Sequence, residues 1–220
     1  MTNSLSSAET PAALADGKAP IRSYLAALNT PTKVLEYTLF QPGLFLNYLA
    51  APYPAASHIR QLNTWFDFQS RRAIVLRGEE HSAKISFTTV QDLAGIVALA
   101  VDYEGEWPVI GGLRAGTVSA AELIALGEKI RPGPGPWEVI TLERADVERG
   151  EIKSGWIPQL VHPSIPKELV EVFSKAYLKE SLTVGMQGGY TVSDEWNVIF
   201  PGYEFTGIEA FLRGAWEGKP

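Results

Sequence analysis

The stretch KAPIRSYLAALNTPTKVLEYTLFQPGLFLNYL, residues 18–49, decides the fold that the sequence predicts. In its first third, Ile21, Leu25 and Leu28 recur at spacings of four and three residues, so they share one face of a helix. An apolar face of this kind needs a partner, and we expect it to pack on a sheet. Pro31 ends the helix because proline cannot continue the hydrogen-bond ladder.

A strand and a turn follow this helix. The run from Val34 to Phe40 is rich in β-branched and aromatic residues, which is typical of a strand buried on both faces. Pro42 and Gly43 come next, and this pair marks a turn. The predicted unit is therefore helix, strand and turn, and the later elements are expected to add to it.

The rest of the chain alternates between strand and helix patterns, which favours an α/β fold. We expect a hairpin of residues 64–68 and 73–76, strands at 84–89, 109–110 and 137–142, and helices at 90–102, 120–130 and 142–150, with a longer one beginning at 164–166 and a last one after 206–209. Three of these helices have capping signals at their starts, namely Thr89 with Asp92, Ser119 with Glu122, and Thr206 with Glu209.

Periodicity also predicts which side chains face inward on two of the helices. On helix 90–102 they are Leu93, Ile96, Val97 and Ala100, and on the helix after residue 166 they are Leu169, Val172, Phe173, Ala176 and Tyr177. Asp92 is interpreted as a cap rather than a catalyst, because a carboxylate in the first turn satisfies free backbone N–H groups and the helix dipole.

Two blocks of residues together resemble a known family. In the first block a helix opens with Lys18 and continues with Ile21 and Arg22, and a strand ends with Tyr37 and Thr38. A turn glycine, Gly43, and an aromatic segment with Phe45, Asn47 and Tyr48 follow. The second consists of Gly78, Phe87, Asp92, Leu93 and Ala94. The order and spacing of these residues resemble those of the NmrA-like and isoflavone-reductase-like branch of the atypical short-chain dehydrogenases. The resemblance covers this chain from Lys18 to the C-terminus.

The resemblance implies a fold and a division of the chain. The fold is the C-terminal part of a Rossmann-like doubly wound parallel sheet with a small interleaved substrate lobe. Residues 1–17 are expected to be a flexible lead, and residues 18–220 an NmrA-like domain that lacks the N-terminal dinucleotide-binding strands. The glycine-rich turn that binds the diphosphate of a dinucleotide in such folds does not occur in this sequence.

The resemblance also implies site residues. Lys18 would be the catalytic residue, beside the nicotinamide ribose and the reacting carbon of NADP. Pro42, Gly43 and Phe45 would contact the cofactor. The substrate would lie between two segments that the family places on either side of it: Asn47 and Tyr48 after the turn, and Phe200 and Tyr203 near the C-terminus.

The residue four positions before Lys18 bears on function. A typical short-chain dehydrogenase has a Tyr there, and this chain has Leu14, which cannot relay a proton. That departure fits the isoflavone-reductase-like branch, and it fits a non-catalytic NmrA-like regulator equally well. The hypotheses are therefore an NAD(P)-dependent oxidoreductase acting on an aromatic or polyketide-like small molecule, a dinucleotide-sensing regulator with a protein partner, and an inactive fragment.

Composition excludes several other classes. The formal net charge of −6 argues against a nucleic-acid surface, and the absence of cysteine excludes thiolate chemistry and disulfides. The histidines His58, His81 and His162 are far apart and lack the spacing of a metal site. No apolar run is long enough to span a membrane and no signal-peptide pattern opens the chain, so we expect a cytoplasmic protein.

Overall fold

The computed structural model describes residues 18–220, and the lead expected for residues 1–17 lies outside them. The elements in chain order are α2 (Lys18–Leu28), β1 (Leu39–Gln41), β2 (Leu44–Phe45), the 3-10 helix η2 (Leu46–Ala50), β3 (Phe66–Asp67), β4 (Arg72–Leu76), β5 (Lys84–Thr88), α3 (Val90–Val101), β6 (Ile110–Gly112), β7 (Gly116–Ser119), α4 (Ala120–Ile130), β8 (Glu138–Leu142), α5 (Arg144–Arg149), the 3-10 helix η3 (Lys167–Leu169), α6 (Val170–Met186), α7 (Glu195–Ile199) and α8 (Ile208–Trp216). The α/β fold class is confirmed, and most expected elements form within a few residues of their predicted bounds.

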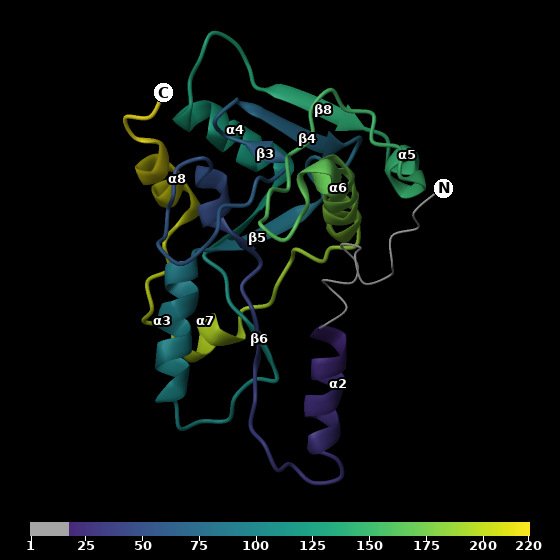
Figure 1. Cartoon of the computed structure of the whole chain (residues 1–220). Helices are drawn as coiled ribbons and strands as arrows, with labels where there is room; N and C mark the ends of the chain where they lie inside the picture. The colour runs from purple at the N-terminus through teal and green to yellow at the C-terminus, as the bar shows by residue number, and fades with distance from the viewer. Residues whose placement is uncertain (1–17) are drawn as a thin grey trace, which may run out of the picture.

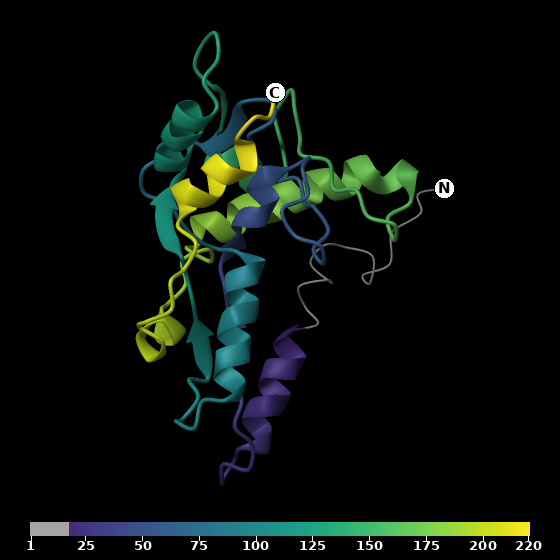
Figure 2. The ribbon, with the colours of Figure 1, turned by 90° about the vertical axis from the view of Figure 1, so that its left-hand side faces the viewer.

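The strands form three small sheets. β1 pairs in parallel with β6, β5 lies between parallel β2 and antiparallel β7, and β4 lies between antiparallel β3 and parallel β8. In Figure 1 the upper part of the molecule holds β3, β4, β8 and β5 with α4, α6 and α8, and the lower part holds β6, α3, α7 and α2. Figure 2, turned by 90°, shows the long helix α6 crossing this upper part.

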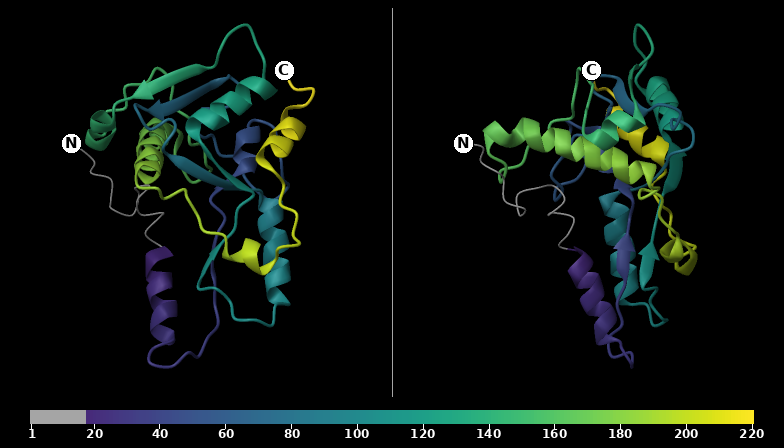
Figure 3. Two further views of the ribbon diagram at one scale, coloured as in Figure 1. Left: turned by 180° about the vertical axis from the view of Figure 1, so that it is seen from behind. Right: turned by 90° about the vertical axis from the view of Figure 1, so that its right-hand side faces the viewer.

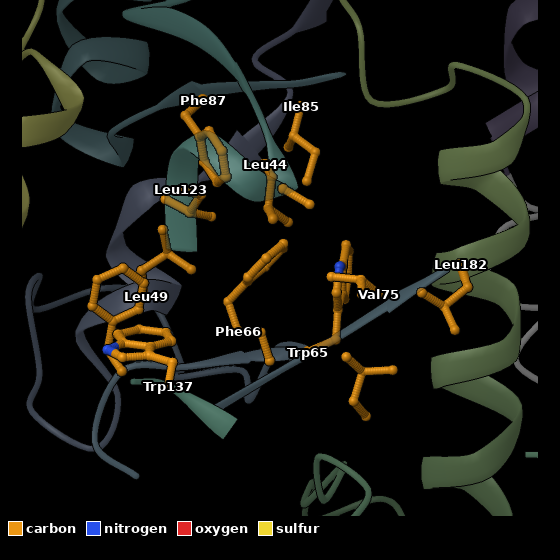
Figure 4. Close-up of a cluster of buried hydrophobic side chains, with 14 of the residues drawn as sticks. Leu44, Leu49, Trp65, Phe66, Val75, Ile85, Phe87, Leu123, Trp137 and Leu182 are labelled. Atoms are coloured by element: carbon orange, nitrogen blue, oxygen red, sulfur yellow. The ribbon is translucent and has the colours of Figure 1, made fainter. Parts of the chain in front are cut away.

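Two apolar clusters fill the interior. The larger one joins the sheets of β2 and β4 to α4, α6 and α8, and Figure 4 shows Leu44, Phe66, Phe87 and Leu182 among its side chains. The smaller cluster joins α3 to α7 through Ile96, Ala100, Leu113 and Trp196. Trp196 stacks between Phe40 and Phe200, with ring centroids 5.5 and 5.6 Å away.

Helix α2 forms where the sequence predicts it, but its expected packing is wrong. None of its residues is buried, and Ile21 is 58% exposed. Figures 1 and 3 show α2 at the lower end of the molecule, apart from the sheets of the upper part. The physical reason is that the neighbouring ladder of β1 and β6 has three residue pairs, which is too small a sheet to offer the helix a face.

The strand predicted for residues 34–40 is also shorter than expected. The side chain of Asn29 accepts hydrogen bonds from the backbone N–H groups of Val34 and Leu35, each over 2.9 Å, and donates to the Leu35 carbonyl over 2.7 Å. These backbone groups are therefore not free to join a ladder, and Val34 and Leu35 stay exposed. The ladder begins only at Leu39.

Helix starts are confirmed in two cases and corrected in a third. Thr89 caps α3, and Ser119 with Glu122 forms the predicted capping box of α4. At α8 the expected box of Thr206 is wrong, because the helix begins after Gly207 without a side-chain cap. Thr206 instead donates from its backbone and its hydroxyl to Asp92, at 3.1 and 3.4 Å.

Inward faces are corrected at single positions. On α3, Ile96 and Ala100 are buried as predicted, whereas Val97 is exposed. On α6 the buried residues are Ser174, Leu178, Ser181 and Leu182, and Val172 faces solvent. The face of α6 that packs on the sheet is therefore turned by about one residue from the predicted one.

Among the helices of residues 18–220, none combines the length and the apolar run needed to cross a bilayer.

Candidate functional site

The β3–β4 hairpin sets an acidic and a basic side chain opposite each other. Asp67 pairs in register with Arg72 across the antiparallel ladder, and Arg72 Nε donates to Asp67 Oδ2 over 2.9 Å. Asp67 Oδ1 accepts from the backbone N–H of Ser70 over 3.0 Å, which closes the turn. Both oxygens of Asp67 therefore have donors, and the ion pair holds the Arg72 side chain in place.

The turn of this hairpin is held from the other side by the loop before β8. Arg71 has a φ of +54°, a conformation that is strained for a residue with a Cβ. Its guanidinium donates to the carbonyls of Arg131, over 2.9 Å, and of Gly135. These bonds offset the strain and fix the hairpin against the α4–β8 connection.

A cavity of about 270 Å³ lies between the hairpin, η2 and the segment 156–159. Its walls combine aromatic rings, amides and one ion pair. The residues that line it are Tyr48, Leu49, Ala51, Pro52, Asn63, Thr64, Phe66, Asp67, Phe68, Gln69, Ser70, Arg72, Trp156, Pro158 and Gln159. We refer to it as the Arg72 cavity.

One wall of the Arg72 cavity is built on Trp156. The guanidinium carbon of Arg72 lies 4.1 Å from the centre of the indole, a cation–π contact. Asn63 Nδ2 donates to the Gln159 carbonyl over 3.0 Å and so ties the same segment to the strand side. Gln69 also lines the cavity, and its buried Oε1 has no hydrogen-bond partner among the described residues.

Tyrosines near the cavity are kept protonated. Burial raises the pKa of the Tyr48 phenol, and it raises the pKa of Tyr177 and Tyr190 as well. For Tyr177 the negative charges that Tyr190 and Tyr48 would carry add to the effect of burial. At neutral pH these groups are hydrogen-bond donors rather than bases.

Lys18, the predicted catalytic residue, is exposed at the first position of α2. Its side chain makes no hydrogen bond or ion pair to a described residue and lines none of the cavities described here. Its catalytic role remains a prediction.

The predicted cofactor residues form a tight turn between β1 and β2. Gly43 has a φ of +67°, and a Cβ placed on it would lie 2.3 Å from the Ser86 carbonyl oxygen. Only glycine fits there, because the turn brings the chain close to β5. Phe45 is half-buried and lies edge-on to Tyr48, with ring centroids 5.8 Å apart.

The predicted substrate residues divide between two places. Asn47 is fully buried, accepts from the backbone N–H of Val90 over 2.9 Å and donates to Gln91 Oε1 over 3.0 Å. Phe200 stacks on Trp196 in the smaller apolar cluster, and Tyr203 donates to Asp92. One residue of each group, Asn47 and Tyr203, therefore hydrogen-bonds to the first turn of α3, whereas Tyr48 and Phe200 lie elsewhere.

Of the eight predicted site residues, Tyr48 lines the Arg72 cavity. Sequence reasoning missed Asp67, Arg72 and Trp156. Opposite charges on either side of a predicted hairpin turn are a signal that could have paired Asp67 with Arg72. The contact of Arg72 with Trp156 joins segments far apart in the chain, and no local pattern indicates it.

The described residues do not fit the diphosphate of a dinucleotide. A diphosphate needs free N–H groups at a helix N-terminus that follows a strand. Helices α3, α4 and α5 follow strands. Thr89 and Asn47 occupy the start of α3, and Ser119 occupies that of α4. The first turns of α3 and α4 also carry a carboxylate that would repel a phosphate, Asp92 or Glu122. The six-residue helix α5 has no side-chain cap, but Glu143 at its N-cap and Asp146 in its first turn are both carboxylates. Residues 18–220 likewise contain no group of three or more His, Asp or Glu side chains placed to hold a metal ion.

No family model matches this chain, and no curated protein matches its sequence. Its structure is similar to a crystal structure of isoflavone reductase, with a TM-score of 0.58 and 17% identity over 93% of this chain and 59% of that chain. It is also similar to AtPrR2 in its apo form (TM-score 0.55, 13% identity, 93% of this chain and 60% of that chain). A third match is AtPrR2 with NADP+ and (+)-pinoresinol (TM-score 0.56, 15% identity, 91% of this chain and 56% of that chain).

The chain therefore spans about three fifths of the length of these solved structures. Identities of this size carry the fold and leave substrate and partners open. Over its described residues, the chain has the fold of the C-terminal part of isoflavone reductase, as the residues from Lys18 onward predict.

Proposed function

We propose that this chain serves an NAD(P)-dependent oxidoreductase that reduces a carbonyl or an activated double bond of an aromatic or polyketide-like small molecule. The observation that carries this proposal is the Arg72 cavity, with aromatic walls beside Tyr48, on the fold of isoflavone reductase. A protein of the same fold, AtPrR2, has been solved with NADP+ and an aromatic ligand, (+)-pinoresinol, which supports both the cofactor and the ligand class.

The substrate side of the reaction follows from the cavity walls. The partly exposed ring of Trp156 offers apolar surface to a planar ring, and the buried Phe66 and Phe68 back this wall of the cavity. Tyr48, held as a neutral phenol, can donate a hydrogen bond to a carbonyl oxygen, and the amides of Gln69 and Gln159 can orient further polar groups. These residues bind and orient the substrate, and none of them is a base at neutral pH.

The cofactor side is proposed from the resemblance, with Lys18 as the catalytic residue and Pro42, Gly43 and Phe45 at the nicotinamide end of NADP. A bound nicotinamide would supply the hydride. Because the described residues offer no cradle for the diphosphate, that group has to be held by residues other than 18–220.

Cofactor binding can be tested by titrating the chain with NADPH and, separately, with reduced nicotinamide mononucleotide, which lacks the adenosine half. If the described residues contribute a nicotinamide site alone, the two ligands bind with similar low affinity. NADPH binding that is tight, saturable and far stronger than that of the mononucleotide would show that the chain holds the diphosphate after all.

Catalysis can be tested by following NADPH oxidation with a panel of aromatic enones and ketones. With NADPH at a concentration high enough to offset the low affinity expected above, the proposal predicts turnover by the native chain and its loss in Lys18→Met. Lys167→Met is a matched control, because Lys167 is an exposed lysine outside all the predicted site residues. Turnover that survives in Lys18→Met would remove Lys18 from the reaction.

A second candidate function is a dinucleotide-sensing regulator that docks on a protein partner without catalysis. The exposure of Lys18, away from the cavities described here, favours it. The two candidates separate in the same assay. A single substrate turned over by the native chain and not by Lys18→Met rejects the regulator, whereas NADPH binding without turnover of any substrate in the panel favours it.

A further inference from the structure

We infer that the Arg72 cavity recognises a carboxylate on a small aromatic ligand, and that Arg72 is the residue that binds it. This inference deepens the proposed function and rests on it in one respect, because it assigns a substrate class to the same cavity.

Arg72 has donors to spare. Within the described residues its side chain makes one hydrogen bond, from Nε to Asp67 Oδ2. The two terminal amino groups have no partner there, although the side chain is only 27% exposed and lines the cavity. A guanidinium edge with two parallel N–H donors matches the two oxygens of a carboxylate.

The surroundings of Arg72 hold it ready for such a ligand. Asp67 fixes the Nε edge, and Trp156 covers one face of the guanidinium at 4.1 Å from the indole centre. Little rotamer freedom is then lost when a ligand binds, which favours recognition. The edge that carries the terminal amino groups is the part of the guanidinium that neither Asp67 nor Trp156 occupies.

The charge of the cavity permits an anion. Asp67 and Arg72 are the only charged residues among those that line it, and both oxygens of Asp67 already accept hydrogen bonds from Ser70 and Arg72. A ligand carboxylate would therefore meet one acidic group that is paired and one basic group that still offers two donors. A ligand ammonium, by contrast, would approach the positive charge of Arg72, which would repel it.

The size and walls of the cavity restrict the rest of the ligand. A volume of about 270 Å³ is at the small end for ligand sites, so it suits a compound with one ring and a short acid chain. The partly exposed rings of Tyr48 and Trp156 match a planar apolar body, and the amides of Gln69 and Gln159 line the same cavity for a polar ring substituent. The ligand class is thus an aromatic acid with a short side chain.

The experiment compares 4-hydroxycinnamate with 4-hydroxycinnamide, which has the same shape without the charge. Binding to the native chain is measured by calorimetry and by quenching of tryptophan fluorescence, without any nicotinamide. We expect the acid to bind at least about tenfold more tightly than the amide, since hydrogen bonds to charged groups are the stronger ones. Equal affinity for the two ligands, or no binding of either, would overturn the inference.

Variants assign the effect to Arg72. Arg72→Lys keeps the charge but loses the planar fork, and Arg72→Met loses both, so the preference for the acid should fall in the first and vanish in the second. Arg77→Gln is the matched control, because Arg77 directly follows the same strand and pairs with Glu143 outside the cavity. If Arg72→Met does not fold, the comparison of acid and amide on the native chain and on Arg72→Lys still decides.

The two proposals fail in different ways. If the acid binds with the expected preference but no aromatic enone, ketone or acid is reduced, the carboxylate site stands and the oxidoreductase proposal fails. If neutral aromatic substrates are reduced while the acid shows no preference over its amide, the oxidoreductase proposal stands and the role of Arg72 is rejected.

Discussion

The hydroxyl of Tyr203 lies 3.2 Å from Oδ1 of Asp92 and donates a hydrogen bond to it. The same carboxylate accepts from the Thr89 hydroxyl over 2.6 Å and from the Thr206 backbone over 3.1 Å. Asp92 is only 4% exposed, so four donors on three residues satisfy a buried charge in the first turn of α3. The contact ties α3 to the segment that leads into α8, and it uses the hydroxyl of a residue expected to bind substrate.

Replacing Asp92 should therefore destabilise the fold. Asp92→Ala leaves the hydroxyls of Tyr203 and Thr89 and the N–H of Thr206 without an acceptor, and we expect a loss of roughly 2–4 kcal/mol in the free energy of unfolding. Urea denaturation measures it. Asp102→Ala is the control, because Asp102 is an exposed carboxylate at the other end of the same helix. A loss no larger than that of the control would contradict the role of Asp92.

Gly43 offers a test of whether the turn after β1 is structural. Gly43→Ala meets two obstacles, a positive φ and the Ser86 carbonyl oxygen 2.3 Å from the new Cβ. Gly78→Ala meets only the first, since Gly78 has a φ of +79° and no atom lies within 4 Å of its Cβ position. We expect both variants to be destabilised, and Gly43→Ala by at least about 2 kcal/mol more. Equal losses in chemical denaturation would show that β5 yields to the added methyl group.

The sequence was a good guide where the signal is local. The capping box of Ser119 and Glu122 and the turn glycine Gly43 depend on neighbours within a few residues, and the structure has both where they were predicted. Helix α2 also formed on local propensity. The predicted packing of α2 on a sheet did not form. Packing depends on which other segments of the chain reach the apolar face, and the periodicity of a helix does not contain that information.

The errors come from contacts between distant segments. Thr206 has the spacing of a cap with Glu209, yet Asp92 takes its hydroxyl and backbone N–H from more than a hundred residues away. Arg72 and Trp156 form the wall of the cavity from different parts of the chain. The resemblance to a family supplied candidate residues near η2 and near α7. Apart from Tyr48, the side chains that line the Arg72 cavity were outside that pattern.

The capping box of α4 predicts how stability depends on pH. The backbone N–H of Ser119 and the ammonium of Lys84 hold the pKa of Glu122 at about 2, against an ordinary value of 4.5. A lowered pKa in the folded state stabilises the fold above the unfolded pKa, and the contribution is lost as the pH falls from about 4.5 to about 2. The melting temperature of the native chain should therefore exceed that of Glu122→Gln at pH 6, and the difference should shrink toward zero near pH 2.

Glu204→Gln is the control, because Glu204 is an exposed carboxylate without an ion pair to a described residue. Its melting temperature should differ less from that of the native chain at pH 6. A difference that stays constant through this pH range would contradict the role of the Glu122 charge.

The ladder of β1 and β6 predicts self-association. Segments 33–40 and 106–112 run side by side, since Lys33 pairs with Glu106 and Leu39 with Ile110, and β1 has no second neighbour among the described residues. Val34 is 72% exposed and Val109 is 51% exposed on this surface, beside an open strand edge, and such edges bind other chains.

We expect the native chain to associate as its concentration rises, as measured by sedimentation velocity. The double variant Val34→Lys and Val109→Lys should stay monomeric, because each lysine would have to be desolvated in the contact. Val161→Lys is the control, since Val161 is 66% exposed, between Val34 and Val109, but lies in the segment before α6. If the control abolishes association as fully as the pair does, the effect is one of net charge and the open edge is not the contact.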